Sequence, residues 1–136
     1  MNKIVLIDDD EDDQLFFKDA LGSINPRMQC KIASNGKIAL DKLKVSTSLP
    51  DLIFLDLNMP IMNGFDFLVQ IKKEEQLNKI LVGIFSTSNS VADMELSKEL
   101  GARFFLTKPN NFQMLRKNLH QLLSADYSTN QYITIS

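Results

Sequence analysis

Acidic, hydroxyl and basic side chains follow short apolar segments at four places in the sequence. Asp8 and Asp9 follow the first segment, Asp56 ends another, and Ser86 and Lys108 follow two later ones. Carboxylates a few ångströms apart repel one another by about 1 to 4 kcal/mol per pair, so a cluster of three needs cations beside it. Lys108 can supply one positive charge, and a divalent ion such as Mg²⁺, which prefers oxygen ligands, can supply two. If these residues meet, they predict a Mg²⁺ site next to a lysine.

Five apolar segments of strand length divide the chain: residues 3–7, 28–33, 52–56, 80–85 and 103–107. Most are continuous runs of Ile, Val, Leu and Phe, which is typical of strands covered on both faces in a parallel sheet. The segments between them place apolar residues at helical spacing. Strand and helix alternating in this way predict an α/β fold, a doubly wound five-stranded parallel sheet with right-handed crossovers.

The predicted sheet explains how residues far apart in the sequence can meet. In an open parallel sheet, functional groups gather beyond the carboxyl ends of the strands, and all the side chains named above follow such ends. The acidic run at residues 8–13 also has a plainer interpretation, because carboxylates are favourable at the start of a helix. We expect only that plainer role for Asp10, Asp12 and Asp13.

One predicted helix carries an expectation about packing. Val91, Met94, Leu96 and Leu100 fall at helical spacing and predict one broad apolar face. Gly101 follows them, where a helix end favours a left-handed residue.

The C-terminus lies outside the alternation of strands and helices. Residues 1–124 are predicted to form one domain and residues 125–136 a tail. The tail is polar at first and then alternates between polar and apolar residues over 132–135. We favour a frayed tail, with an added edge strand as the alternative.

Composition places the chain among ordinary globular proteins. Its 136 residues are 44% hydrophobic and 24% charged, enough for one domain with a buried core. The net charge of -2 argues against a nucleic-acid partner or a polybasic membrane surface. No apolar run approaches the roughly 20 residues that span a bilayer, and the start MNKIVLIDDD turns acidic too soon for a signal peptide. We therefore expect a cytoplasmic protein with no membrane partner.

Four short motifs make the sequence resemble the receiver domain of bacterial two-component response regulators over residues 3–123. They are IDD at 7–9, LDLNMPIMNG at 55–64, FSTS at 85–88 and TKP at 107–109. Each motif is short, but their order and spacing are specific together: Asp56 and Ser86 are 30 positions apart, and Ser86 and Lys108 are 22 apart. The resemblance implies a flavodoxin-like three-layer sandwich with strand order 2-1-3-4-5.

The resemblance also implies a role for each residue of the acidic cluster. Asp56 would be the phosphoacceptor and would contribute to the Mg²⁺ site. Asp9 would bind Mg²⁺ directly and Asp8 through water, while Asn58 would offer its backbone carbonyl. A carboxylate nucleophile forms an aspartyl phosphate, and such phosphoryl transfer depends mainly on positioning and charge neutralisation.

Three residues on the later strands would respond to the phosphoryl group. Ser86 would be the switch hydroxyl that bonds it, and Lys108 would pair with one of its oxygens. Phe105 falls where the family has its aromatic switch residue, often Tyr, and a plain core residue is the other interpretation. The resemblance also implies a cis bond between Lys108 and Pro109.

These implied roles describe a stand-alone receiver that takes a phosphoryl group from the phosphohistidine of a sensor histidine kinase or phosphotransfer protein. It would phosphorylate itself with Mg²⁺, lose the group by slow autodephosphorylation, and not be a dedicated metabolic enzyme. Since the chain offers no output domain, we expect signalling through a downstream protein or a possible homodimer, on the surface of residues 90–123.

Two alternatives stay open. One is a receiver-like scaffold that works without phosphorylation, which the intact set of acids, hydroxyl and lysine argues against. The other is an aspartate-nucleophile phosphatase, which would need a second aspartate where this sequence has Asn58.

Overall fold

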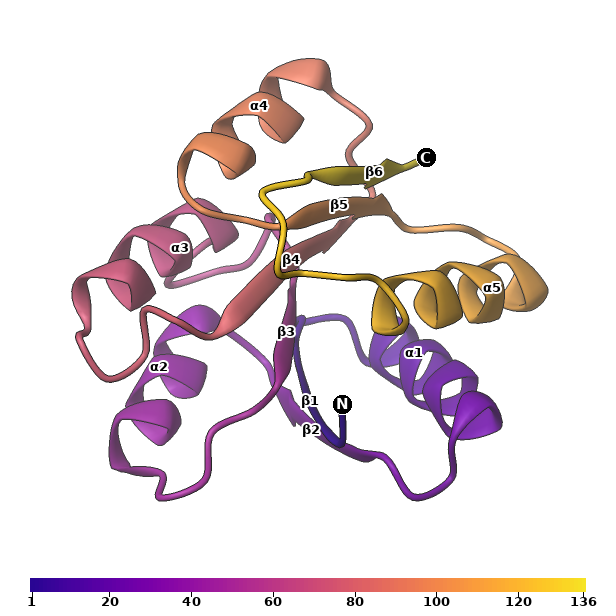
Figure 1. Cartoon of the computed structure of the whole chain (residues 1–136), viewed down its shortest axis with the longest axis horizontal. Helices are drawn as coiled ribbons and strands as arrows, with labels where there is room; N and C mark the ends of the chain where they lie inside the picture. The colour runs from indigo at the N-terminus through magenta and orange to yellow at the C-terminus, as the bar shows by residue number, and fades with distance from the viewer.

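The computed structural model describes residues 1–136, in which six strands alternate with five helices (Figure 1). The strands are β1 (Lys3–Ile7), β2 (Gln29–Ala33), β3 (Leu52–Leu55), β4 (Leu81–Ser86), β5 (Phe104–Thr107) and β6 (Ile133–Ile135). The helices are α1 (Glu11–Ile24), α2 (Gly36–Val45), α3 (Gly64–Lys73), α4 (Val91–Glu99) and α5 (Phe112–Leu123). The first five strands match the five predicted apolar segments to within one residue at each end.

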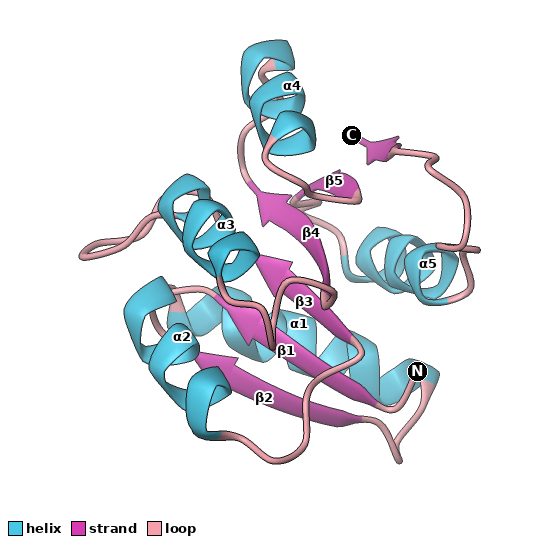
Figure 2. Cartoon of the chain, turned by 60° about the vertical axis from the view of Figure 1, so that its left-hand side comes forward, coloured by secondary structure: helices cyan, strands magenta, loops and turns pink.

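All six strands are parallel and form one sheet in the order β2-β1-β3-β4-β5-β6 (Figure 2). The prediction of a doubly wound α/β fold is confirmed, whereas the prediction of five strands in the order 2-1-3-4-5 is wrong by one strand. β1 and β3 are neighbours, and the chain leaves them in opposite directions, toward β2 and toward β4. Sites in such sheets lie beyond the carboxyl ends of the strands at this reversal.

Helices cover both faces of the sheet and make three layers (Figure 1). α1 and α5 enclose one cluster of buried apolar side chains, which includes Phe17, Phe54 and Leu119. α2 and α3 enclose the other, which includes Leu43 and Phe67. Every residue of β3 is buried. Covering on both faces is the reason why the strand sequences are continuously apolar.

Each helix begins after a residue whose side-chain oxygen accepts a hydrogen bond from a backbone N–H of the first turn. These N-caps are Asp10, Asn35, Asn63, Ser90 and Asn111. Such a cap is worth about 0.5 to 2 kcal/mol relative to alanine. Local sequence therefore decides where α1 and α3 start, close to the ends of β1 and β3.

The C-terminal tail forms an edge strand rather than a frayed end. β6 runs parallel to β5, with Phe104 opposite Ile133 and Leu106 opposite Ile135. α5 is the crossover between β5 and β6, so the tail completes one more strand–helix–strand unit. The alternative of an added edge strand is confirmed, and the favoured frayed tail is wrong.

Contacts from other parts of the chain explain why this strand forms. The Tyr132 hydroxyl donates to the backbone carbonyl of Met94 on α4 at 3.2 Å and lies 3.0 Å from the hydroxyl of Ser97. The Arg103 guanidinium donates to the backbone carbonyl of Tyr127 at 2.9 Å. The tail is thus held by residues outside its own sequence, which is why its local pattern was a weak guide.

The packing of α4 also differs from the prediction. Val91 and Leu96 are 67% and 42% exposed, and Ser97 is the buried residue of the helix. α4 lies beside β5 near the edge of the sheet (Figure 1), so little of its surface meets the core. Gly101 does end the helix as expected, with a φ of 103°.

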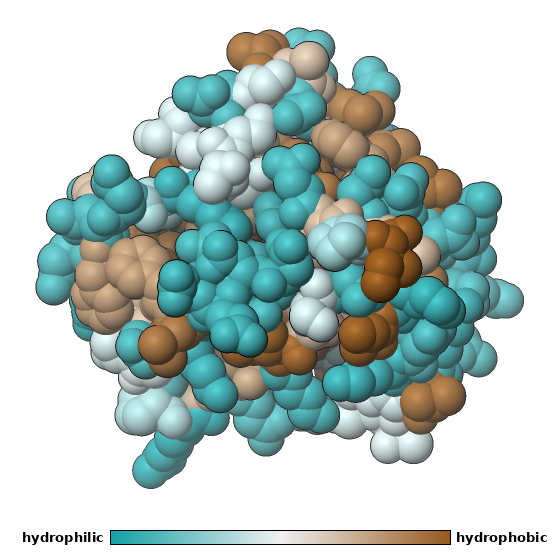
Figure 3. Space-filling model, turned by 180° about the vertical axis from the view of Figure 1, so that it is seen from behind, coloured by the Kyte–Doolittle hydropathy of each residue, from teal (hydrophilic) through white to brown (hydrophobic).

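The face of the molecule opposite the view of Figure 1 is mostly hydrophilic, and its hydrophobic residues are scattered. Figure 3 shows this from behind, with hydrophilic residues gathered near the centre of the view. Isolated exposed apolar side chains of this kind are normal for globular proteins. None of the helices has the length and apolar character that a membrane crossing requires.

Candidate functional site

Asp8 and Asp56 lie at the carboxyl ends of the neighbouring strands β1 and β3. The backbone N–H of Asp8 donates to the carbonyl of Ala33 at 3.0 Å, and that of Asp56 donates to the carbonyl of Ile7 at 2.9 Å. Both side chains are buried, whereas Asp9 is exposed. One oxygen from each of the three carboxylates lies within 4.8 Å of the others. The acidic cluster expected from the sequence is therefore present in the fold.

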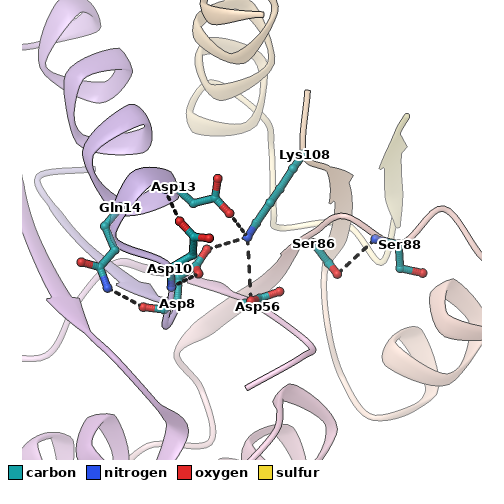
Figure 4. A network of polar contacts seen from close by, with 8 residues as sticks. All are labelled: Asp8, Asp10, Asp13, Gln14, Asp56, Ser86, Ser88 and Lys108. Carbon is teal, nitrogen blue, oxygen red and sulfur yellow. Dashed lines mark hydrogen bonds and ion pairs between the residues drawn. The ribbon is translucent and has the colours of Figure 1, made fainter. Parts of the chain in front are cut away.

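Lys108 reaches this cluster from the end of β5 (Figure 4). Its backbone N–H donates to the carbonyl of Ser86 at 2.7 Å, which joins the ends of β5 and β4. Its Nζ lies 2.7 Å from Oδ2 of Asp13, 2.8 Å from Oδ2 of Asp8 and 3.8 Å from Oδ2 of Asp56. The side chain is only 9% exposed, so one ammonium group is largely enclosed by carboxylates.

The loop between β3 and α3 brings the start of α3 against the backbone of Asp56. Gly64 donates its N–H to the carbonyl of Leu57 at 3.0 Å. A Cβ atom on Gly64 would lie 2.4 Å from the carbonyl oxygen of Asp56, so only glycine allows this approach. The preceding Asn63 caps α3 by accepting a hydrogen bond from the Asp66 N–H at 2.9 Å. The Asn63-Gly64 pair thus sets how closely α3 approaches the acidic cluster.

Burial shifts the pKa values of two acids of the cluster, Asp8 and Asp56. It raises the pKa of Asp56 to about 6, although the charge of Lys108 acts to lower it. Burial likewise raises the pKa of Asp8. For Lys108, burial acts to lower the pKa, but contacts with Asp13 and Asp8 outweigh it and leave that pKa raised. At neutral pH a lysine cation therefore stands beside an Asp56 that is mainly ionised.

The acidic cluster suits a hard divalent cation. Its donors are carboxylate oxygens of Asp8, Asp9 and Asp56, and Mg²⁺ prefers oxygen ligands. Oδ2 of Asp8 is fully buried and accepts no hydrogen bond of good geometry, even though Nζ of Lys108 lies 2.8 Å away. One ammonium shared with Asp13 is the only close cationic partner of this buried charge, and a bound cation would stabilise it further. The residues present therefore fit Mg²⁺.

Ser86 ends β4, the strand next to β3, and its hydroxyl faces the following loop (Figure 4). Its Oγ is buried and accepts a hydrogen bond from the Ser88 N–H at 3.3 Å. The Ser88 hydroxyl donates to Oδ2 of Asp93 on α4 at 2.6 Å, and its carbonyl accepts from the Thr107 hydroxyl at 3.0 Å. A chain of hydrogen bonds thus connects Ser86 with both α4 and β5.

Phe105 and Asn58 lie where the sequence placed them, but their expected roles stay predictions. Phe105 is fully buried in β5 and belongs to the cluster that packs under α2 and α3. Asn58 is exposed in the loop just after Asp56. The bond between Lys108 and Pro109 is trans, because the structure contains no cis peptide bond, so that expectation is wrong.

Two residues of α1 contact Lys108 or Asp8, a role that the sequence analysis did not give them. Asp13, expected to be a plain helix-start acid, forms the hydrogen bond with Lys108. Gln14 donates its side-chain amide to the backbone carbonyl of Asp8 at 2.7 Å. Asp10 is the N-cap, as expected, and its carboxylate accepts the Asp13 N–H at 2.9 Å. This cap places Asp13 in the first turn of α1, but no local signal in the sequence shows that its carboxylate reaches Lys108.

Comparison with known proteins connects these features with one family. The family model for the response regulator receiver domain matches residues 4–120. The probable methanogenesis regulatory protein FilR2 of Methanothrix harundinacea (strain 6Ac) is 28% identical over 123 residues, which cover 88% of this chain and 79% of that protein. The transcriptional regulatory protein CpxR of Escherichia coli (strain K12) is 33% identical over 131 residues, which cover 96% of this chain. The chain spans only 53% of CpxR and still less of several other curated relatives.

Solved structures agree with the sequence matches. The phosphorylated cyanobacterial phytochrome response regulator RcpA has a TM-score of 0.82 at 30% identity, covering 90% of this chain and 94% of its own. The Mn²⁺-bound form of the response regulator Rcp1 has a TM-score of 0.81 at 27% identity, covering 93% and 97%. The chemotaxis response regulator CheY4 of Vibrio cholerae has a TM-score of 0.76 at 27% identity, covering 90% and 98%. With the family match spanning most of its length, this chain belongs to the response regulator receiver family.

Proposed function

We propose that this receiver accepts a phosphoryl group on Asp56 from the phosphohistidine of a sensor histidine kinase or a phosphotransfer protein, with Mg²⁺ held by Asp8, Asp9, Asp56 and the Asn58 carbonyl. Receiver domains of two-component systems take phosphoryl groups from sensor histidine kinases. The observation that carries the proposal is the buried Asp56 carboxylate, with a pKa of about 6, next to a lysine cation and two further carboxylates.

In the transfer, an oxygen of the Asp56 carboxylate attacks the phosphorus of the phosphohistidine. The new P–O bond forms as the P–N bond breaks, and the imidazole nitrogen keeps the electron pair. Mg²⁺, when bound, supplies charge neutralisation at the phosphoryl oxygens. Nζ of Lys108, 3.8 Å from Oδ2 of Asp56, needs only a small movement to pair with one of these oxygens. Hydrolysis reverses the modification when water attacks phosphorus and the carboxylate leaves.

The response to phosphorylation begins at Ser86. Its hydroxyl would turn from the Ser88 N–H toward a phosphoryl oxygen. Because Ser88 also contacts Asp93 and Thr107, the change would reach α4 and β5. Phosphorylation shifts the equilibrium between the two conformations. The free energy of this shift can be no larger than the difference between their interaction free energies with the phosphoryl group. Phe105 is the proposed aromatic switch on the same strand.

The proposed output surface is the face formed by α4, β5 and α5. β6 covers the outer edge of β5, so a downstream protein or a second copy of the chain would meet the tail there. A single-domain mode of action is supported by the similarity to RcpA, Rcp1 and CheY4 over nearly their whole lengths. The cytoplasmic location and the absence of a nucleic-acid partner stay predictions from the sequence.

The test is the intact mass of the protein after incubation with acetyl phosphate and Mg²⁺. We expect the wild type to gain about 80 Da, the mass of one phosphoryl group. The gain should vanish in Asp56→Asn and when a chelator removes the metal. Asp19→Asn is the matched control, because Asp19 is exposed on α1 and should leave the gain intact. Size-exclusion chromatography of the same samples shows whether the phosphoryl group drives dimer formation.

Other outcomes of this test identify the alternatives. A wild type that gains no mass with donor and metal both present would be a receiver-like scaffold, and our proposal would be wrong. Steady consumption of acetyl phosphate without any adduct would point to a phosphatase, even though Asn58 stands where such an enzyme needs its second aspartate.

A further inference from the structure

We propose that Asp13 is a built-in competitor of the phosphoryl group for Lys108, and that it thereby lowers the rate and the extent of Asp56 phosphorylation. This inference rests on the proposed function of Asp56. It assigns a role to a residue of α1 that lies outside the motifs of the sequence and outside the acidic cluster of Asp8, Asp9 and Asp56.

The first support is the geometry of Lys108. Its Nζ is nearer to Asp13, at 2.7 Å, than to Asp56, at 3.8 Å. The contact with Asp13 is a hydrogen bond, and the same ammonium pairs with Oδ2 of Asp8 at 2.8 Å. In this structure Asp13 of α1 and Asp8 therefore hold Lys108 more closely than the nucleophile Asp56 does (Figure 4).

The second support is that Asp13 is held in place and yet can be released. Its backbone N–H is bonded to the carboxylate of the N-cap Asp10, which sets the rotation of the first turn of α1. Its side chain is 36% exposed, so water can take over the carboxylate when Lys108 leaves. Asp8, by contrast, is fully buried and has no such alternative.

The third support is electrostatic. A phosphoryl group adds close to two negative charges and three acceptor oxygens next to Asp56. To pair with it, Lys108 must share or give up the bond with Asp13, and the Asp13 carboxylate is left as one more negative charge nearby. Both effects oppose phosphorylation, so they predict the same direction of change when the charge of Asp13 is removed.

The matched control is the next residue along the helix. Asp12 carries the same charge on the same turn of α1, but it is exposed and makes no ion pair or side-chain hydrogen bond. Asp13→Asn and Asp12→Asn therefore change the net charge equally, and only Asp13→Asn removes one of the two carboxylates that hold Lys108 within 2.8 Å. Asp13→Glu restores the charge with a longer side chain and is the rescue variant.

The experiment follows adduct formation by intact mass in the full chain, with acetyl phosphate and Mg²⁺. We expect Asp13→Asn to raise the initial rate and the plateau by roughly threefold to fivefold, the upper part of the range for an ion pair with one partly exposed partner. Asp12→Asn should change both by less than about twofold, and Asp13→Glu should return them toward wild type. Asp13→Ser removes the charge with another residue suited to a first turn and should rise like Asp13→Asn, which guards against a folding defect in one variant.

The outcomes separate this inference from the function on which it rests. If the wild type takes up no phosphoryl group, the proposed function fails and the role of Asp13 fails with it. If the wild type is modified but both Asp13→Asn and Asp13→Ser react at the wild-type rate or more slowly, Asp13 positions Lys108 or is neutral, and only the competitor role is overturned. An equal rise in Asp12→Asn would reduce the effect to net charge and would also overturn it.

Discussion

The carboxyl edge of the sheet and its β5–β6 edge are stabilised in different ways. At the carboxyl edge, carboxylates crowd around one ammonium group, and burial raises the pKa of Asp56 to about 6. Folding therefore disfavours the ionised carboxylate of Asp56, which the proposed reaction needs. At the β5–β6 edge, strand pairing and the hydrogen bonds of Tyr132 and Arg103 hold the tail. Substitutions at the first edge should therefore alter reactivity strongly and can raise stability, whereas those at the second should lower stability and leave reactivity alone.

The largest effect is expected from Lys108→Met, which keeps the aliphatic stem and removes the cation. The rate of Asp56 phosphorylation should fall by about 100-fold or more, the range for loss of one preorganised charge at a developing anion. The rate is measured by intact mass with acetyl phosphate and Mg²⁺. Lys37→Met is the control, because Lys37 forms an exposed pair with Asp41 on α2 and should leave the rate unchanged. A loss of less than about fivefold in Lys108→Met would contradict the role given to this cation.

A smaller effect, an increase in stability, is expected when the buried charge of Asp56 is removed. The folded pKa of Asp56 is about 6, whereas an unfolded aspartate has a pKa near 3.9. Between these values the folded state binds more protons, so this group makes the free energy of unfolding fall as pH rises from about 4 to about 6. Asp56→Asn cannot ionise and should be more stable than the wild type at pH 7 by on the order of 1 to 3 kcal/mol without metal.

Urea unfolding in chelator at pH 7 and pH 4 measures this difference. The advantage of Asp56→Asn should be largest at pH 7 and nearly absent near pH 4, where the folded carboxyl is protonated and the unfolded one, with a pKa near 3.9, is about half protonated. Asp66→Asn, at an exposed position on α3, is the control and should show no such pH dependence. An advantage of the same size at both pH values would mean that the charge of Asp56 is not its cause.

The smallest effect is expected at the tail. Tyr132→Phe removes the hydroxyl that contacts Met94 and Ser97, so it should lower stability by roughly 1 kcal/mol. Amide exchange in β6 should become faster, while the phosphorylation rate should stay at its wild-type value. Thr134→Val is the control, because Thr134 is exposed and its side chain makes no hydrogen bond. A changed phosphorylation rate in Tyr132→Phe would show that the two edges are coupled.

The acidic cluster was predictable because it depends on the ends of strands. Once continuous apolar runs indicate a parallel sheet, residues such as Asp8, Asp56 and Lys108 must meet at one edge. Helix starts depend on equally local features, since Asp10 and Asn63 cap the turns that directly follow them. The apolar face predicted for α4 failed because periodicity shows which residues share a face, and not how much of that face the core covers.

The sequence by itself determined the α/β class, the positions of five strands and the set of acids, hydroxyl and lysine, because these follow from local patterns and from the geometry of parallel sheets. Only the tertiary structure decided the hydrogen bond between Asp13 and Lys108, which joins residues 95 positions apart. It also decided that the tail becomes β6, because Tyr132 is held by α4. Contacts between distant segments depend on the rotation of helices and on which strand stays unpaired at the edge, and neither can be read from a local pattern.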